Sequence, residues 1–142
     1  MAGGGSGDRD AAAAEAELRA GFETLAVTRT DPSAGVYEVR LNRPAQRNAL
    51  SPAAFAEIPR AMSLLDRTPT ARAVVLSAAG PHFCAGIELE GPGDPLAAAS
   101  AAGAGDPVAA AEALRRAVLD MQAALTAIER CRKPVVAAVH GA

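Results

Sequence analysis

A loop of small residues at positions 78–86 is the part of the sequence best suited to chemistry. It follows a short apolar run, residues 73–77, and carries Ala85 and Gly86 immediately before Ile87. Small side chains let a ligand approach the main chain closely, and free backbone N–H groups at the start of a helix can donate to an anionic oxygen. The pattern therefore predicts a main-chain site for a negatively charged oxygen. The alternative is a tight strand-to-helix turn that binds nothing.

The side chains around this loop offer weaker chemistry. His82 and Cys84 are two residues apart, but no third group orients them as a nucleophile and its base. Together with Cys131 and His140 they show none of the repeated C-x-x-C or H-x-x-x-H spacings of zinc sites. We therefore assign no metal, and we expect both histidines to pack or hydrogen-bond ordinarily. The two distant cysteines indicate reduced thiols in an intracellular compartment.

The elements ahead of the loop predict a hairpin and a helix. Residues 22–30 and 36–41 are typical of strands, with apolar and charged residues alternating in the second, and a turn sequence joins them. Ser51 and Pro52 then favour a helix start, with a capping hydroxyl and a proline at the first helical position. Pro59 is expected to kink or shorten that helix.

The second half of the chain predicts strand, helix, strand. Residues 73–77 and 135–139 are apolar runs typical of strands buried on both faces of a parallel sheet. Between them, apolar residues recur at steps of four and three, which predicts a long helix with one buried stripe ending near residue 131. The stripe consists of Leu114, Val118, Met121, Leu125 and Ile128.

Composition sets the organisation of the chain. Residues 1–21 offer almost nothing large to bury and are interpreted as a flexible tail, with one core domain over residues 22–142. Within that domain the Gly-, Pro- and Ala-rich residues 91–107 are expected to form a mobile surface loop. The chain stops directly after a strand, where parallel sheets collect their chemistry, so we interpret it as the first part of a larger fold.

Charge and hydropathy exclude several classes of function. The formal net charge is −2 and lysine is nearly absent, so no basic field is available to bind nucleic acid. No apolar run approaches the roughly 20 residues that span a bilayer, and the amino terminus has no secretory signal. We therefore expect no membrane span, and nucleic acid is not expected as the main partner.

Four motifs, in order along the chain, resemble the enoyl-CoA hydratase/isomerase (crotonase) family. They occupy residues 41–50, 72–77, 82–89 and 133–141. Four ordered motifs are hard to obtain by chance, and the resemblance covers nearly everything after the tail. Residues 85–89 and 121–131 are most similar to the plant-type Δ3,5-Δ2,4-dienoyl-CoA isomerases.

The resemblance implies an α/β fold of the crotonase (ClpP/crotonase) type. This fold is a spiral of strand-strand-helix repeats, usually a trimer or hexamer, and is expected here in truncated form. It also implies an acyl-CoA isomerase of fatty-acid β-oxidation that converts 3,5-dienoyl to 2,4-dienoyl thioesters through an enolate. Coenzyme A belongs to the substrate, so no separate cofactor is expected. The implied compartment is the peroxisome, with the mitochondrion as the alternative.

Within this resemblance, the backbone N–H of Ile87 is the first oxyanion donor. Arg47, Ala49 and Leu50 match the motif that lies along coenzyme A. The remaining substrate-binding residues are Ala85, Gly86, Ile87, Glu88 and Leu89. Preorganised N–H donors stabilise the negative oxygen that develops when a proton leaves the carbon beside a thioester.

The chain also departs from the family pattern. Glu88 stands where an aspartate is usual, and we assign it no proton-transfer role. The Gly-Gly-Gly run with the second donor, and the acidic residues after it, are expected beyond Ala142, so the chain alone is expected to be inactive. Two alternatives stay open: an enoyl-CoA hydratase, and a non-catalytic form that binds coenzyme A esters or full-length subunits. Scattered charges disfavour an RNA-binding member of the fold, and no serine triad supports a protease.

Overall fold

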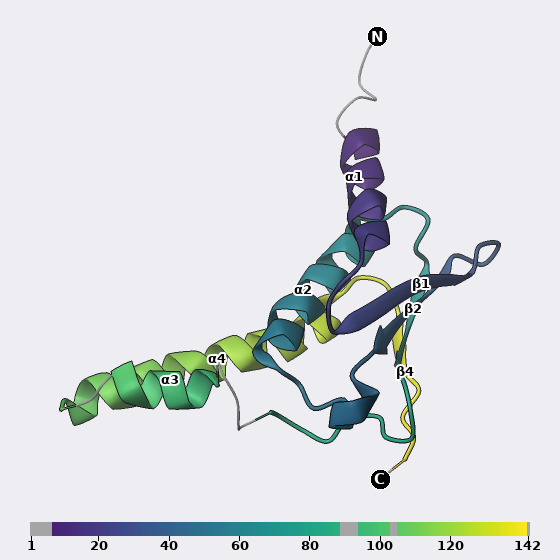
Figure 1. Ribbon diagram of the computed structural model, residues 1–142. Helices are drawn as coiled ribbons and strands as arrows, with labels where there is room; N and C mark the ends of the chain where they lie inside the picture. Colours follow the sequence, from purple (N-terminus) through teal and green to yellow (C-terminus); the bar gives the residue numbers. More distant parts are fainter. Residues whose placement is uncertain (1–6, 89–93, 103–104, 142) are drawn as a thin grey trace.

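The computed structural model describes residues 7–88, 94–102 and 105–141 and places helices against one face of a mixed β-sheet (Figure 1). The strands are β1 (Leu25–Asp31), β2 (Val36–Leu41), β3 (Ala73–Ala78) and β4 (Val135–Ala137), in the order β1-β2-β3-β4. The helices are α1 (Gly7–Ala20), the 3-10 helix η1 (Pro44–Gln46), α2 (Pro52–Arg67), α3 (Pro95–Ala102) and α4 (Pro107–Arg130). No helix in these ranges is long and apolar enough to cross a bilayer.

The expected hairpin is confirmed. Strands β1 and β2 pair antiparallel, and Asp31 closes the turn between them. Its Oδ1 accepts from the N–H groups of Ser33 and Ala34, both at 2.9 Å, and from the Ser33 hydroxyl at 2.7 Å. These donors, the Ala34 N–H first, hold the pKa of the Asp31 carboxyl below its usual value. An aspartate that binds the backbone two and three residues later is a local turn signal.

The order strand, helix, strand is also confirmed, but the burial expected for these strands is wrong. β2, β3 and β4 run parallel, with α2 and α4 as the crossovers between them. The helices cover only one face of the sheet, and Val136 of β4 is 63% exposed; the strand expected over residues 135–139 ends at Ala137, and Val139 beyond it is 70% exposed. Apolar composition predicted the strands correctly, but burial on a second face requires a partner that the described chain does not supply.

Helix α2 contributes many of the buried side chains of the hydrophobic core. Ser51 caps it by accepting from the Ala54 N–H at 3.3 Å, and the helix continues through Pro59 to Arg67, so the proline does not end it. Its buried face packs on the inner face of the sheet. The largest fully buried side chains are Met62, Leu64, Leu65, Val39, Val74 and Thr68.

The expectation of a tail over residues 1–21 is wrong for the part that the structure describes. Residues Gly7–Ala20 form α1, in which Ala14 and Leu18 are buried in the core. The Thr70 hydroxyl donates to Glu15 Oε1 at 2.8 Å and adds a polar tie. Alanine side chains are short and let α1 lie close to the core, where Leu18 is the large apolar side chain that it buries.

The expected surface loop at 91–107 is wrong where it can be compared. Residues 95–102 form α3, and Asp94 accepts from the Leu96 N–H at 2.8 Å at its start; residues 89–93 and 103–104 lie outside the described ranges. Alanine is the strongest helix former, which explains the helix. α3 packs on the first half of α4 in an arm that projects from the sheet (Figure 1).

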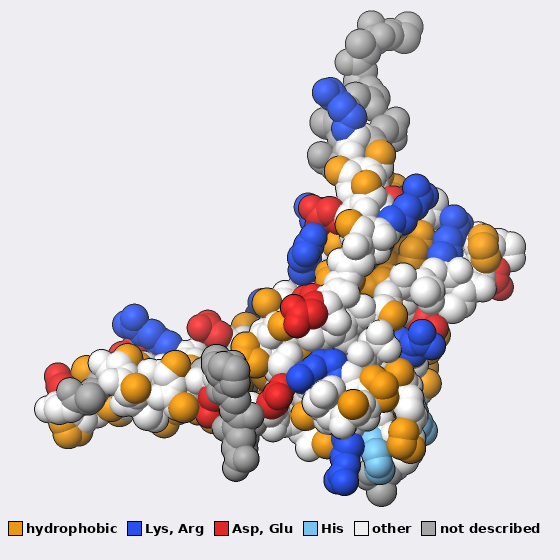
Figure 2. Space-filling view, in the orientation of Figure 1, with side chains coloured by type: hydrophobic (Ala, Val, Ile, Leu, Met, Phe, Trp, Pro, Cys, Tyr) orange, Lys and Arg blue, Asp and Glu red, His pale blue; other side chains and the backbone are white. Residues whose placement is uncertain are grey.

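The helix expected over residues 114–128 is present, but its apolar stripe is only partly buried. Met121 is buried, as is Ala124, whereas three other members of the stripe are 36–46% exposed. These are Leu114, Val118 and Leu125. Apolar side chains are accordingly visible along the projecting arm in Figure 2. The expectation of full burial is therefore wrong for Leu114, Val118 and Leu125.

Candidate functional site

Asn48 joins the segment after β2 to the loop after β3. It has a left-handed backbone (φ 56°), which asparagine tolerates better than most residues, and it is only 2% exposed. Its Oδ1 accepts from the Arg43 N–H at 2.9 Å. Its Nδ2 donates to the carbonyls of Ala79 and His82 at 2.8 and 2.7 Å. The hydrogen bonds of the Asn48 side chain therefore hold the first part of the small-residue loop in position.

A short parallel ladder holds the other end of the loop. The Ala85 N–H donates to the Arg47 carbonyl at 3.0 Å. The Leu50 N–H donates to the Gly86 carbonyl at 2.8 Å, and the Glu88 N–H donates to the Leu50 carbonyl at 3.0 Å. Two of the sequence motifs thus lie side by side, because β2 and β3 are parallel and end at the same edge of the sheet.

This ladder sets the direction of the Ile87 N–H. The Gly86 carbonyl and the Ile87 N–H belong to one planar trans peptide, so they point in opposite directions. Because the carbonyl points at the Leu50 N–H, the Ile87 N–H points away from Leu50. It donates to no atom of residues 7–88, 94–102 or 105–141, and Ile87 is 43% exposed. The structure thus presents an oriented donor that has no partner among the described residues.

Gly86 is required for this conformation. Its φ is +105°, a backbone that side-chain-bearing residues rarely adopt, whereas a Cβ built there would meet no atom within 4 Å. The constraint is therefore conformational and not a lack of space.

Arg43 and Glu88 form an ion pair beside the ladder. Arg43 Nη1 donates to Glu88 Oε2 at 2.6 Å and to the Ala49 carbonyl at 3.0 Å. The two side chains are 22% and 32% exposed, so the pair is largely shielded from water. Glu88 is thus held by a cation. Sequence reasoning singled out neither Arg43 nor Asn48, although both lie in the motif at residues 41–50.

The residues expected along coenzyme A differ in what they present. The Arg47 side chain is exposed and forms no hydrogen bond or ion pair with the part of the chain that the structure describes. Leu50 is buried and Ala49 offers its carbonyl to Arg43, so both act in the site through the main chain. Leu89 lies outside the described residues.

The remaining polar side chains of the loop are engaged locally. His140 Nε2 lies 2.9 Å from the Gly80 carbonyl, and its ring meets Phe83 edge-on at 6.4 Å. The expected ordinary role of His140 is confirmed. Cys84 Sγ accepts from the Gly86 N–H at 3.5 Å. Among the described residues, no group of three His, Cys, Asp or Glu could hold a metal ion.

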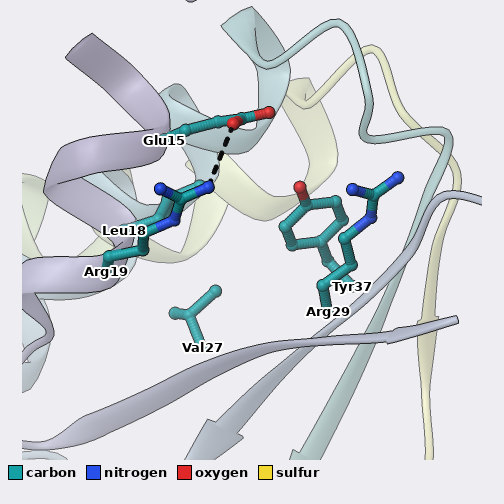
Figure 3. Close-up of a pocket in the computed structure, with 6 residues that line it drawn as sticks. All are labelled: Glu15, Leu18, Arg19, Val27, Arg29 and Tyr37. Carbon is teal, nitrogen blue, oxygen red and sulfur yellow. Dashed lines mark ion pairs between the residues drawn. The ribbon is translucent and has the colours of Figure 1, made fainter. Parts of the chain in front are cut away.

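Of two cavities in the described structure, one adjoins the site. One, of about 390 Å³, opens beside the ion pair and is lined by Glu23, Arg43, Ser51, Pro52, Ala53, Glu88 and Asp94. The other, of about 170 Å³, lies between α1 and the hairpin (Figure 3) and is lined by Glu15, Leu18, Arg19, Val27, Arg29 and Tyr37. Its lining includes none of residues 43–50 or 79–88, and Glu15 pairs at 3.6 Å with Arg19, one turn later on the same helix. It is separate from the donor loop.

Comparison with known proteins agrees with this geometry. The sequence profile described as enoyl-CoA hydratase/isomerase matches residues 31–142. The chain is 45% identical, over 121 residues, to the peroxisomal Delta(3,5)-Delta(2,4)-dienoyl-CoA isomerase of Arabidopsis thaliana. It is 39% identical, over 128 residues, to the mitochondrial Delta(3,5)-Delta(2,4)-dienoyl-CoA isomerase of Homo sapiens. These alignments cover 85% and 84% of the chain, but only 43% and 35% of the relatives.

A solved structure agrees as well. That of Pseudomonas aeruginosa AtuE superposes with a TM-score of 0.66 at 35% identity, over 84% of this chain and 41% of that one. The α/β crotonase fold is thereby confirmed, and the chain spans less than half the length of the relatives it matches. The chain belongs to the enoyl-CoA hydratase/isomerase family.

Proposed function

We propose that this chain is the part of an acyl-CoA isomerase that holds the thioester carbonyl, with the Ile87 N–H as oxyanion donor. One observation carries the proposal. The Gly86 carbonyl is fixed on the Leu50 N–H, so the Ile87 N–H at the opposite end of the same peptide points away from Leu50 and donates to no described residue. Such a donor is rigid before the ligand arrives and needs no particular side chain.

The chemistry follows from the charge on the oxygen. Removal of the C2 proton of a 3,5-dienoyl thioester delocalises an electron pair over the carbon chain and the carbonyl oxygen. Return of a proton at C6 gives the 2,4-dienoyl thioester, so atoms and electrons balance. A preorganised N–H donor stabilises the anionic intermediate and is typically worth about 10²- to 10³-fold in rate.

The substrate class is proposed from the relatives. Proteins 45% and 39% identical to this chain are named Delta(3,5)-Delta(2,4)-dienoyl-CoA isomerases, peroxisomal in one case and mitochondrial in the other. We propose the same thioester class, with coenzyme A as part of the substrate and the exposed Arg47 guanidinium toward its phosphates. The compartment is one of these two, with the peroxisome favoured by the higher identity.

We expect no turnover by the 142-residue chain alone. Glu88, the carboxylate next to the donor, is occupied by Arg43, and no described residue is assigned to move the proton. Thioester binding without turnover is the behaviour of a partial site. Incubation with a 3,5-dienoyl-CoA, monitored by the absorbance of the conjugated 2,4-dienoyl product, tests this expectation.

Binding can be read at the donor itself. The sequence holds three isoleucines, Ile58, Ile87 and Ile128, so ¹⁵N-isoleucine labelling gives one amide resonance in the site and two in helices. Titration with a saturated acyl-CoA thioester should move the Ile87 amide proton downfield and leave the other two in place. Free coenzyme A, which has no carbonyl at that position, is the ligand control. If Ile87 does not respond to the thioester, or responds equally to free coenzyme A, the proposal is wrong.

A matched pair of variants separates the site from general strain. Gly86 and Gly21 both have positive φ, +105° and +85°, and at both a Cβ would meet no atom within 4 Å. G86A and G21A should therefore each cost about 1–3 kcal/mol of stability. Only G86A should also weaken the Ile87 response to the thioester, because only there does the strained residue share a peptide with the donor.

A further inference from the structure

We infer that Arg43, through its ion pair with Glu88, is the positioning residue of the oxyanion donor. The inference rests on the proposed function and extends it to two side chains that touch neither the carbonyl nor the reacting carbons. The observation that motivates it is a closed set of contacts around one peptide.

The contacts form a clamp on both sides of Ile87. On one side, the Gly86 carbonyl is bound by the Leu50 N–H. On the other side, Glu88 is bound twice, by its N–H to the Leu50 carbonyl and by its carboxylate to Arg43.

Arg43 closes this clamp because it holds both partners of the ladder. The same Nη1 atom reaches Glu88 Oε2 at 2.6 Å and the carbonyl of Ala49, the residue before Leu50, at 3.0 Å. Its own N–H is bound by the buried Asn48 side chain. The guanidinium therefore fixes the distance between the two ladder segments.

The surroundings make these contacts effective. Charge-assisted hydrogen bonds are stronger than neutral ones, and shielding from water strengthens them further. By contrast, the Arg132 side chain in the Arg132–Asp66 pair is 75% exposed, so that pair resembles ordinary surface ion pairs. It serves as a control within the same protein.

The distance that the side chain of residue 88 must span to meet Arg43 explains why this position holds glutamate where an aspartate is usual in the family pattern. Glu88 meets Arg43 directly, and glutamine at this position keeps the length but loses the charge. Aspartate keeps the charge but is one methylene shorter. Lysine in place of Arg43 keeps the charge, but its compact ammonium does not reproduce the rigid fork of the guanidinium. These three changes separate charge from reach.

The test reads the Ile87 amide in the ¹⁵N-isoleucine chain, first without ligand. R43Q and E88Q should move the Ile87 resonance, whereas R132Q should leave it in place. Ile58 and Ile128 report that the fold is intact in each variant. R43K and E88D should each retain more of the wild-type Ile87 resonance than the corresponding glutamine variant. An Ile87 resonance that stays at its wild-type position in both R43Q and E88Q overturns the inference.

Titration with the acyl-CoA thioester then measures the consequence. R43Q and E88Q should each raise the thioester concentration that gives half of the maximal Ile87 shift by about tenfold. R132Q should leave that concentration unchanged. A thioester affinity unchanged in all three variants contradicts the positioning role. If the wild-type chain shows no thioester response at all, the proposed function fails, and the ligand-free measurement still decides whether Arg43 positions the peptide.

Discussion

Helices α2 and α4 begin alike and end in different surroundings. Each starts with a proline after a capping side chain, Ser51 for α2 and Asp106 for α4. Each carries apolar residues at helical spacing. Leu65 of α2 is 0% exposed against the sheet, whereas Leu114, in the first half of α4, is 39% exposed.

The difference shows what amphipathic spacing does and does not determine. It selects a helix and the face that needs a partner, but it does not supply the partner. α2 lies over the sheet, while the first half of α4 projects with α3 beyond the sheet (Figure 1). Burial of apolar area stabilises α2, and propensity, capping and the α3 contact maintain the projecting half of α4.

The largest expected effect comes from the same substitution in the two helices. Leu65→Ala removes a fully buried side chain and should lower the free energy of unfolding by about 2–5 kcal/mol. Leu114→Ala should lower it by about 1 kcal/mol or less, because Leu114 is already 39% exposed. Urea denaturation measured by circular dichroism gives both values. Equal losses would show that α4 is covered in solution.

Removal of the helix caps should sharpen the contrast. The Ser51 hydroxyl accepts from the Ala54 N–H, and Asp106 Oδ1 accepts from Val108 and Ala109. Ser51→Ala should cost about 1 kcal/mol of global stability. Asp106→Ala should instead fray the first turns of α4, seen as faster hydrogen exchange there, with little change in the urea midpoint. A midpoint shift equal to that of Ser51→Ala would mean that the arm unfolds together with the core.

The smallest expected change in stability concerns the ion pair between Asp66 of α2 and Arg132, just after α4. Arg132, just after α4, donates to Asp66 of α2 at 2.9 Å, and this bonding holds the pKa of the Asp66 carboxyl below its usual value. A depressed pKa in the folded state means that the contribution is present above the ordinary value near 4 and is lost as the pH falls through the folded value. Asp66→Asn should therefore be slightly less stable than wild type at pH 7, and this difference should shrink as the pH falls through the lowered pKa of the folded state. If the stability difference between Asp66→Asn and wild type persists at low pH, its cause is the amide side chain and not the lost ion pair.

Local patterns predicted the elements of the fold. The hairpin followed from alternation and turn residues, and the two crossover helices followed from periodicity. The composition of residues 91–107 does not reveal helix α3, because its Gly and Pro residues indicate a loop whereas its alanines favour helix. Helix α1 was missed because it contributes only Leu18 and alanines to the core.

The site was predictable only in part, for a different reason. The motif resemblance indicated the Ile87 amide and the segment at residues 47–50. The roles of Arg43 and Asn48 depend on contacts with residues more than 30 positions away, which exist only once two parallel strands end at the same edge. Spacing along the chain carries no signal for such contacts.

The main-chain nature of the Ile87 donor has a consequence for how this site tolerates change. Every amino acid except proline brings the same N–H, so nearly all single-codon changes at position 87 preserve the group that meets the oxygen. A survey that looks for an invariant side chain would overlook this position. Inherited variation that disables it should instead collect at the glycine before it and in the segments that brace it.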